Sequence, residues 1–114
     1  MDADWTKLSR LAESELSRLR HSLPADLRDQ FDTITVFMEE AAEDDNLGLF
    51  EGPAFAEESD IELPARMTLF LLNIWDEADH DEAVFRQEVR ITLLHELGHY
   101  LGLNEKELAD RELE

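Results

Sequence analysis

Residues 81–105 read DEAVFRQEVRITLLHELGHYLGLNE, and the first twenty of these positions carry a helical pattern. Apolar side chains recur along it at helical spacing: Phe85, Val89 and Leu93. Asp79, with Glu82 three positions later, predicts the start of the helix as an acidic capping box. The sequence therefore predicts one unbroken helix from about residue 81 to residue 101.

The second half of this helix carries the motif His95-Glu96-Leu97-Gly98-His99. Two histidines four positions apart share one helix face, so their imidazoles can hold one Zn²⁺ ion. Glu96 projects beside that ion, where it can accept a proton from a zinc-activated water. The alternative for both histidines is ordinary hydrogen bonding on a helix surface, the usual fate of a lone histidine. The pattern favours a zinc site with Glu96 as general base for hydrolysis of an amide, most simply a peptide bond.

Gly102 and Glu105 extend the motif beyond the helix. Glycine is the usual residue just after a helix end, because it readily adopts a positive φ. A turn at Gly102 would bring Glu105 back toward the metal, whereas continued helix would carry it about 15 Å away from the first histidine. Glu105 is thus the expected third ligand, with Glu107 and Asp110 as nearby alternatives, and a fourth position is left for water. A short helix over residues 105–112 is expected to follow.

The composition of the chain limits the number of domains, the class of partner and the metal ligands. A length of 114 residues suits a single domain, residues 1–114. With 29 acidic and 10 basic residues the net charge is −19, which argues against a nucleic-acid partner. Such a surface would attract a basic peptide or protein substrate, although an acidic exterior also simply keeps a small protein in solution. There is no cysteine, so histidine and carboxylate must hold any metal.

The N-terminal residues are acidic where a signal peptide would be basic, and no apolar run approaches the length of a membrane span. We therefore expect a cytoplasmic protein without a membrane partner. A single small domain with one site favours a monomer.

The rest of the chain predicts one helix and two strands. Residues 4–21 follow an amphipathic helical pattern, whose apolar stripe is typical of core packing. Residues 33–38 alternate as a strand does, with Ile34, Val36 and Met38 on one face. Residues 66–75 are apolar enough for a strand covered on both faces, and we expect the two strands to pair. The fold class is therefore α+β, with a small mixed or antiparallel sheet packed on an N-terminal helix and the long motif helix.

Residues 39–62 contain ten acids and no base, with glycine and proline interrupting any periodicity, and predict a long surface loop. The loop could cover the site as a flap. Its apolar residues either line a substrate groove or anchor the loop: Leu47, Leu49, Phe50 and Phe55. Tyr100 and His80 are assigned to packing and to the surface, although Tyr100 could also stabilise an oxyanion.

The run HELGHYLGLNE at residues 95–105 resembles the zinc helix of the metzincins, H-E-x-x-H-x-x-G-x-x-H/D. It departs from that pattern at Glu105, and no methionine follows for a Met-turn. The chain looks more like the bacterial minimal zincin-like metallopeptidases, which have a matrix-metalloproteinase-like core and in which an acid at the position of Glu105 is common. The resemblance covers residues from 66 onward well and residues 1–60 loosely.

This resemblance implies a zincin-like fold and a zinc-dependent peptidase. Zincins bind substrate antiparallel to an edge strand of the sheet, so one of the two predicted strands should be that edge. A non-catalytic metal-binding or protein-interaction module on the same scaffold is the main alternative. A metal-free acidic protein with a fortuitous motif is the third.

Overall fold

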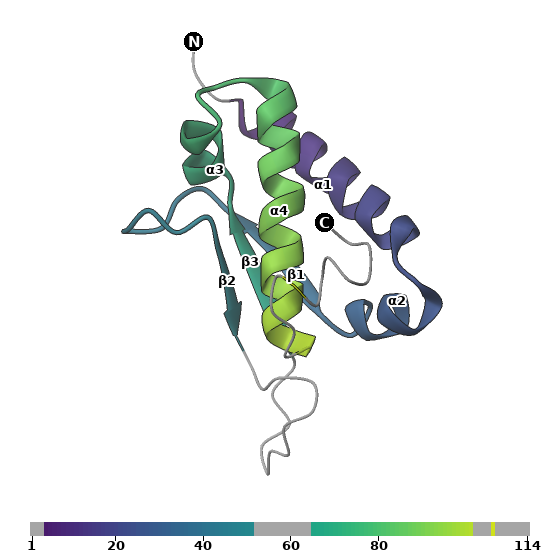
Figure 1. Cartoon of the computed structure of the whole chain (residues 1–114). Coiled ribbons are helices and arrows are strands. Elements are labelled where there is room, and N and C mark those ends of the chain that lie inside the picture. The colour runs from purple at the N-terminus through teal and green to yellow at the C-terminus, as the bar shows by residue number, and fades with distance from the viewer. Residues whose placement is uncertain (1–3, 52–64, 102–105, 107–114) are drawn as a thin grey trace.

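The computed structural model describes residues 4–51, 65–101 and 106 of the chain. The helices in this part are α1 (Trp5–Ser22), α2 (Ala25–Phe31), α3 (Leu71–Glu77) and α4 (Glu82–Leu101), and the strands are β1 (Thr35–Glu39), β2 (Gly48–Glu51) and β3 (Arg66–Phe70) (Figure 1). The predicted α+β class is confirmed. The predicted turn at Gly102, the third ligand Glu105 with its alternatives, and the helix over 105–112 lie outside the described residues.

The three strands form a mixed sheet in the order β1-β3-β2. β1 runs parallel to β3, beginning with the pair Thr35 and Arg66, which confirms the predicted pairing of the two strand segments. β2 runs antiparallel to β3, with Gly48 opposite Leu69. β3 is therefore the central strand, and four of its five residues are buried, as its apolar sequence predicted.

Helix α1 forms as predicted. The Asp4 carboxylate caps its N-terminus by accepting a hydrogen bond from the Thr6 backbone N–H at 3.0 Å. The helix ends ahead of Pro24, whose ring would clash with a continued turn. Its apolar stripe is buried in the core, as expected of a packing face: Leu8, Leu11, Ala12 and Leu19.

Helix α2 has no counterpart in the prediction and is tied to the end of α1 by two arginines. The Arg28 guanidinium donates to the backbone carbonyls of Arg20 and Leu23, at 3.2 and 3.0 Å, and the Arg20 carbonyl also accepts from the Leu23 N–H at 3.2 Å. Arg20 in turn donates two hydrogen bonds of 2.7 Å to the Asp32 carboxylate. These bonds lower the pKa of Asp32 below its usual value.

The prediction of one strand over 66–75 is wrong beyond Phe70, because the chain turns there into α3. A continuous apolar run does not distinguish a buried strand from a buried helix. The helical form is fixed by three buried side chains at spacings of three and four, Leu71, Ile74 and Ala78. The Leu72 N–H donates to the Glu40 carbonyl at 2.8 Å, which joins the start of α3 to the end of β1.

Two further predictions need correction. Residues 39–62 are not loop throughout, because Gly48–Glu51 form β2, a short edge strand that depends on its long-range pairing with β3. Asp79 is not the cap of α4, since it adopts a positive φ of 54° in the turn before the helix. Asp81 takes that role, and its carboxylate accepts from the Val84 N–H at 3.0 Å. Capping by an aspartate was thus predicted two residues too early.

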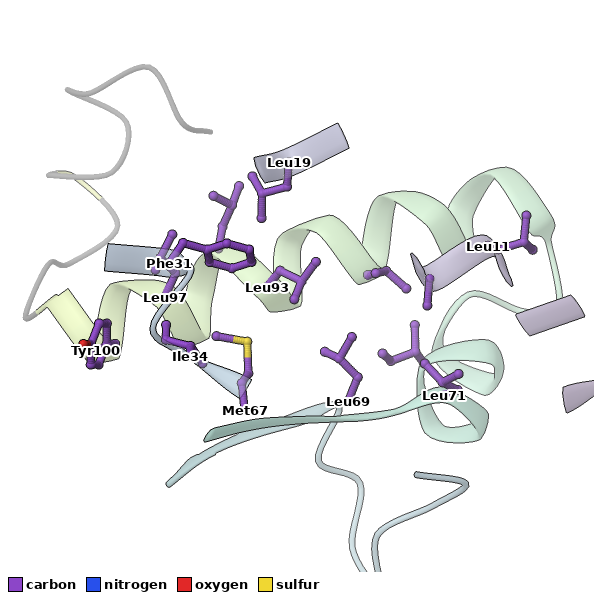
Figure 2. Close-up of a cluster of buried hydrophobic side chains, with 14 of the residues drawn as sticks. Leu11, Leu19, Phe31, Ile34, Met67, Leu69, Leu71, Leu93, Leu97 and Tyr100 are labelled. Carbon is purple, nitrogen blue, oxygen red and sulfur yellow. The ribbon is translucent and has the colours of Figure 1, made fainter. Parts of the chain in front are cut away.

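The core lies between the sheet, α4 and α1. Figure 2 shows Met67 and Leu69 of β3 facing Leu93 and Leu97 of α4, with Leu19 of α1 on the other side of the Leu93 side chain. Burial on two sides fixes the rotation of α4 about its axis, because its apolar stripe must face the sheet and α1. The described helices include none that is long and apolar enough to cross a membrane.

Candidate metal centre

The packing of α4 decides which of its side chains face outward. Val89, Leu93 and Leu97 are fully buried against the core. His95 and His99 lie on the opposite, exposed side of the helix, as their offset from this stripe requires. A single rigid helix therefore holds both imidazoles at the surface with fixed spacing.

The three motif side chains gather into one group. The imidazole rings of His95 and His99 lie with their centroids 4.6 Å apart and their planes at 61°. Each of these residues and Glu96 offers one ligand atom, and the three atoms lie within 4.8 Å of one another. Glu96 Oε2 lies 3.4 Å from His99 Nδ1. The structure thus brings together the three residues that the motif predicted.

The motif side chains differ in how much of their surface is exposed to solvent. The side chain of His99 is 54% exposed, whereas that of Glu96 is 9% exposed. The His95 side chain forms no hydrogen bond with any described residue, so ordinary hydrogen bonding does not account for its presence. Two accessible imidazoles beside a carboxylate are a donor set that suits a divalent metal such as zinc. The group could hold a metal ion.

A cavity of about 350 Å³ opens beside this group. One wall is α4, with Glu88, Ile91 and Thr92 in addition to His95 and Glu96. The other wall comes from β2 and the residues just before it, Asp45–Gly48. Glu96 and His95 therefore both border a space that can accept a small part of a ligand.

Gly48 allows β2 to pass close to α4. A Cβ atom at this position would lie 2.6 Å from Thr92 Cγ2, 3.3 Å from the Thr68 carbonyl oxygen and 3.5 Å from Glu96 Cγ. Any side chain here would push the strand away from the helix. The glycine thus sets the distance between the edge of the sheet and Glu96.

We predict that Gly48→Ala destabilises the protein by about 1–3 kcal/mol, the usual cost of overpacking a tight site. The measurement is the free energy of unfolding in urea. Thr92→Ser removes the Cγ2 atom that the new Cβ would strike, so adding it to Gly48→Ala should recover much of the loss. Costs that simply add in the double variant would show that this contact does not set the strand position.

The two other side chains considered from the sequence have structural roles. Tyr100 is buried, its hydroxyl lies 3.0 Å from the Thr33 hydroxyl, and its ring packs against Phe50 at 5.5 Å. His80 stacks on Trp75 and contacts the Asp76 carboxylate at 2.8 Å. Packing and surface roles for these two residues agree with the expectation.

Besides His95 and Glu96, sequence reasoning considered Leu47 as a groove residue and missed the other residues that line the cavity. Glu88 and Thr92 share a helix face with His95, a spacing that could have revealed them. No comparable signal exists for Asp45 or Gly48, because their place opposite α4 follows from the pairing of β2 with β3. Gly48 was interpreted only as an interruption of periodicity.

Comparison with curated proteins finds no match to this chain. A family comparison matches residues 24–114, most of the chain, to the zincin-like metallopeptidases. The match includes β1, β2, β3 and α4, and so covers both walls of the cavity and the motif. The exposed histidine pair, the buried glutamate and this match together assign the chain to the zincin-like metallopeptidase family.

Proposed function

We propose that this protein is a zinc-dependent peptidase in which His95 and His99 hold the metal and Glu96 is the general base. The observation that carries the proposal is the position of Glu96, a buried carboxylate that is grouped with two exposed imidazoles and lines a cavity. Glu105 is proposed as the third ligand on sequence alone. We also propose, from the motif, that the chain is of the bacterial minimal zincin-like type.

When bound, zinc would supply a Lewis acid that lowers the pKa of a water and polarises a carbonyl group. The chain supplies the proton acceptor. A carboxylate oxygen of Glu96 takes the proton of the attacking water and returns it to the amide nitrogen as the peptide bond breaks. The low exposure of Glu96 keeps bulk water from competing for this carboxylate.

The sheet supports one edge as the place of substrate binding. β1 and β2 are the two edges of the sheet, and β2 is the edge beside Glu96. In the described part of the chain no strand pairs with the outer side of β2. An extended peptide can therefore add to β2 through backbone hydrogen bonds, which fix its position without reading much of its sequence.

The test is cleavage of a peptide library by the zinc-loaded full chain, with new termini identified by mass spectrometry. We expect cleavage that stops when a chelator removes the metal and returns when zinc is restored. Stoichiometric zinc without any cleavage would contradict the proposal and favour a non-catalytic metal-binding module on the same scaffold.

A further inference from the structure

The cavity beside the metal group has two chemically different ends. His95 and Glu96 line it from the second half of α4, whereas Glu88 lines it from earlier in that helix and Asp45 from the segment before β2. Glu88 precedes His95 on α4 by about two turns, which is roughly 10 Å along the helix axis. A long side chain anchored near Glu96 could therefore reach the acidic end.

Among the described residues, no basic side chain pairs with either of these two acids. The side chains of Asp45 and Glu88 form no ion pair or hydrogen bond with another described residue. Between them and Glu96 lies Thr92, which is 6% exposed. Two carboxylates that no basic side chain of the described residues neutralises favour a ligand that brings a positive charge and hydrogen-bond donors.

The middle of the cavity is apolar on both walls. Leu47 lines it from the side of β2, and Ile91 lines it from α4. Ile91 is 43% exposed, which leaves its side chain free to contact a ligand. Lysine and arginine combine an apolar stem with a charged head. Their side chains therefore match a cavity that has an apolar part next to an acidic part.

Hydrogen bonds from α3 fix the backbone on both sides of Asp45. The Asn73 side-chain amide donates to the carbonyls of Asp44 and Asn46, at 3.0 and 2.8 Å, on either side of Asp45. The Phe70 N–H donates to the Leu47 carbonyl at 3.0 Å. These bonds hold the backbone of this segment before any ligand arrives, which lowers the entropic cost of binding.

The direction of β2 places the acidic end relative to the substrate. Gly48 lies beside Thr92 and Glu96, and Phe50 packs on Tyr100, so β2 advances along α4 in the same direction as the helix (Figure 1). A peptide added antiparallel to β2 runs the opposite way. Its residues after the cleaved bond therefore extend toward Asp45 and Glu88.

We propose that this cavity is a specificity subsite for the side chain of a lysine or arginine that lies within the first three residues after the cleaved bond. Leu47 and Ile91 contact the stem, and Asp45 and Glu88 bind the charged head. The inference rests on the proposed peptidase function and names the substrate class of that site.

The experiment compares matched peptides that carry arginine or its neutral isostere citrulline at each of these positions. With the zinc-loaded wild-type protein we expect arginine to raise kcat/KM roughly fivefold, the scale of a partly exposed ion pair. Glu88→Gln and Asp45→Asn should each reduce the preference, and the pair together should abolish it. Glu88→Arg should reverse it in favour of a glutamate-containing peptide.

Binding gives a second readout that does not depend on turnover. Fluorescence anisotropy with the Glu96→Gln variant should show the same preference for arginine over citrulline, and its loss when Glu88→Gln is added. Glu13→Gln with Asp29→Asn is the matched control, because it removes two exposed acids of α1 and α2 that do not line the cavity. This control should retain the preference of the wild type.

Cleavage without a preference for arginine would overturn the subsite, as would a preference confined to positions before the cleaved bond. An equal loss in the Glu13 and Asp29 control would assign the preference to the net charge of the protein and would overturn it too. Absence of any cleavage by the wild-type protein would instead contradict the proposed function.

Discussion

Replacing Glu96 by glutamine is expected to lower kcat/KM for peptide cleavage by about 100-fold to 10,000-fold, the range that general bases contribute. Glutamine has nearly the same shape as glutamate, but its amide cannot accept the proton of the attacking water. Because Glu96 is only 6% exposed, solvent cannot easily replace it as proton acceptor. The measurement is steady-state cleavage of one peptide found in the library.

A lower kcat/KM shows the loss of the general base only if the Glu96→Gln variant keeps its zinc and its fold. Zinc content by elemental analysis and thermal unfolding followed by circular dichroism supply these controls. Glu13→Gln makes the same chemical change on the exposed face of α1 and should leave kcat/KM unchanged. A folded, zinc-containing Glu96→Gln protein with full activity would remove Glu96 from the mechanism.

Phe85→Ala is expected to destabilise the protein by about 3–5 kcal/mol, the usual cost of emptying a buried phenylalanine site. The Phe85 side chain has no exposed surface and meets the Trp75 ring edge-on at 5.6 Å. It attaches the first turns of α4 to α3, so its loss should loosen the helix that carries the motif. The measurement is the free energy of unfolding in urea.

Val84 provides the matched control for this change. It is the preceding residue in the same turn of α4 but is 38% exposed. Val84→Ala should therefore change the free energy of unfolding by no more than about 0.5 kcal/mol. Similar losses in both variants would show that the start of α4 is not anchored through Phe85.

The helices that a local pattern specifies were predictable from the sequence. The two long helices, α1 and α4, repeat apolar residues over several turns, and this repeat excludes a strand. The segment 66–75 was predicted wrongly after Phe70, because the leucines there are equally compatible with a buried strand and with a buried helix. Only the tertiary core, which buries Leu71 and Ile74 at helical spacing, decides between them.

Short elements that depend on distant partners were not predictable. β2 has four residues and exists through its pairing with β3, and α2 is held by Arg28 and the pair of Arg20 with Asp32. Local sequence carries little information on such contacts, since their energy is realised only in the folded chain.

The candidate site was likewise predictable in part. His95, Glu96 and His99 belong to one helix, so their spacing alone predicted the group that the structure contains. The opposite wall of the cavity comes from the segment before β2, and its position required the sheet. Glu105 lies outside the described residues, and its role as third ligand stays a prediction.

The zinc content of the purified protein is the most direct test of the metal centre formed by His95 and His99. Elemental analysis of the wild type, Glu96→Gln, His95→Ala and His99→Ala compares the four proteins at equal concentration, with circular dichroism to confirm folding. We expect stoichiometric zinc in the wild type and in Glu96→Gln, and its loss in both folded histidine variants. A wild type without zinc, or histidine variants that retain it in full, would contradict the proposed metal centre.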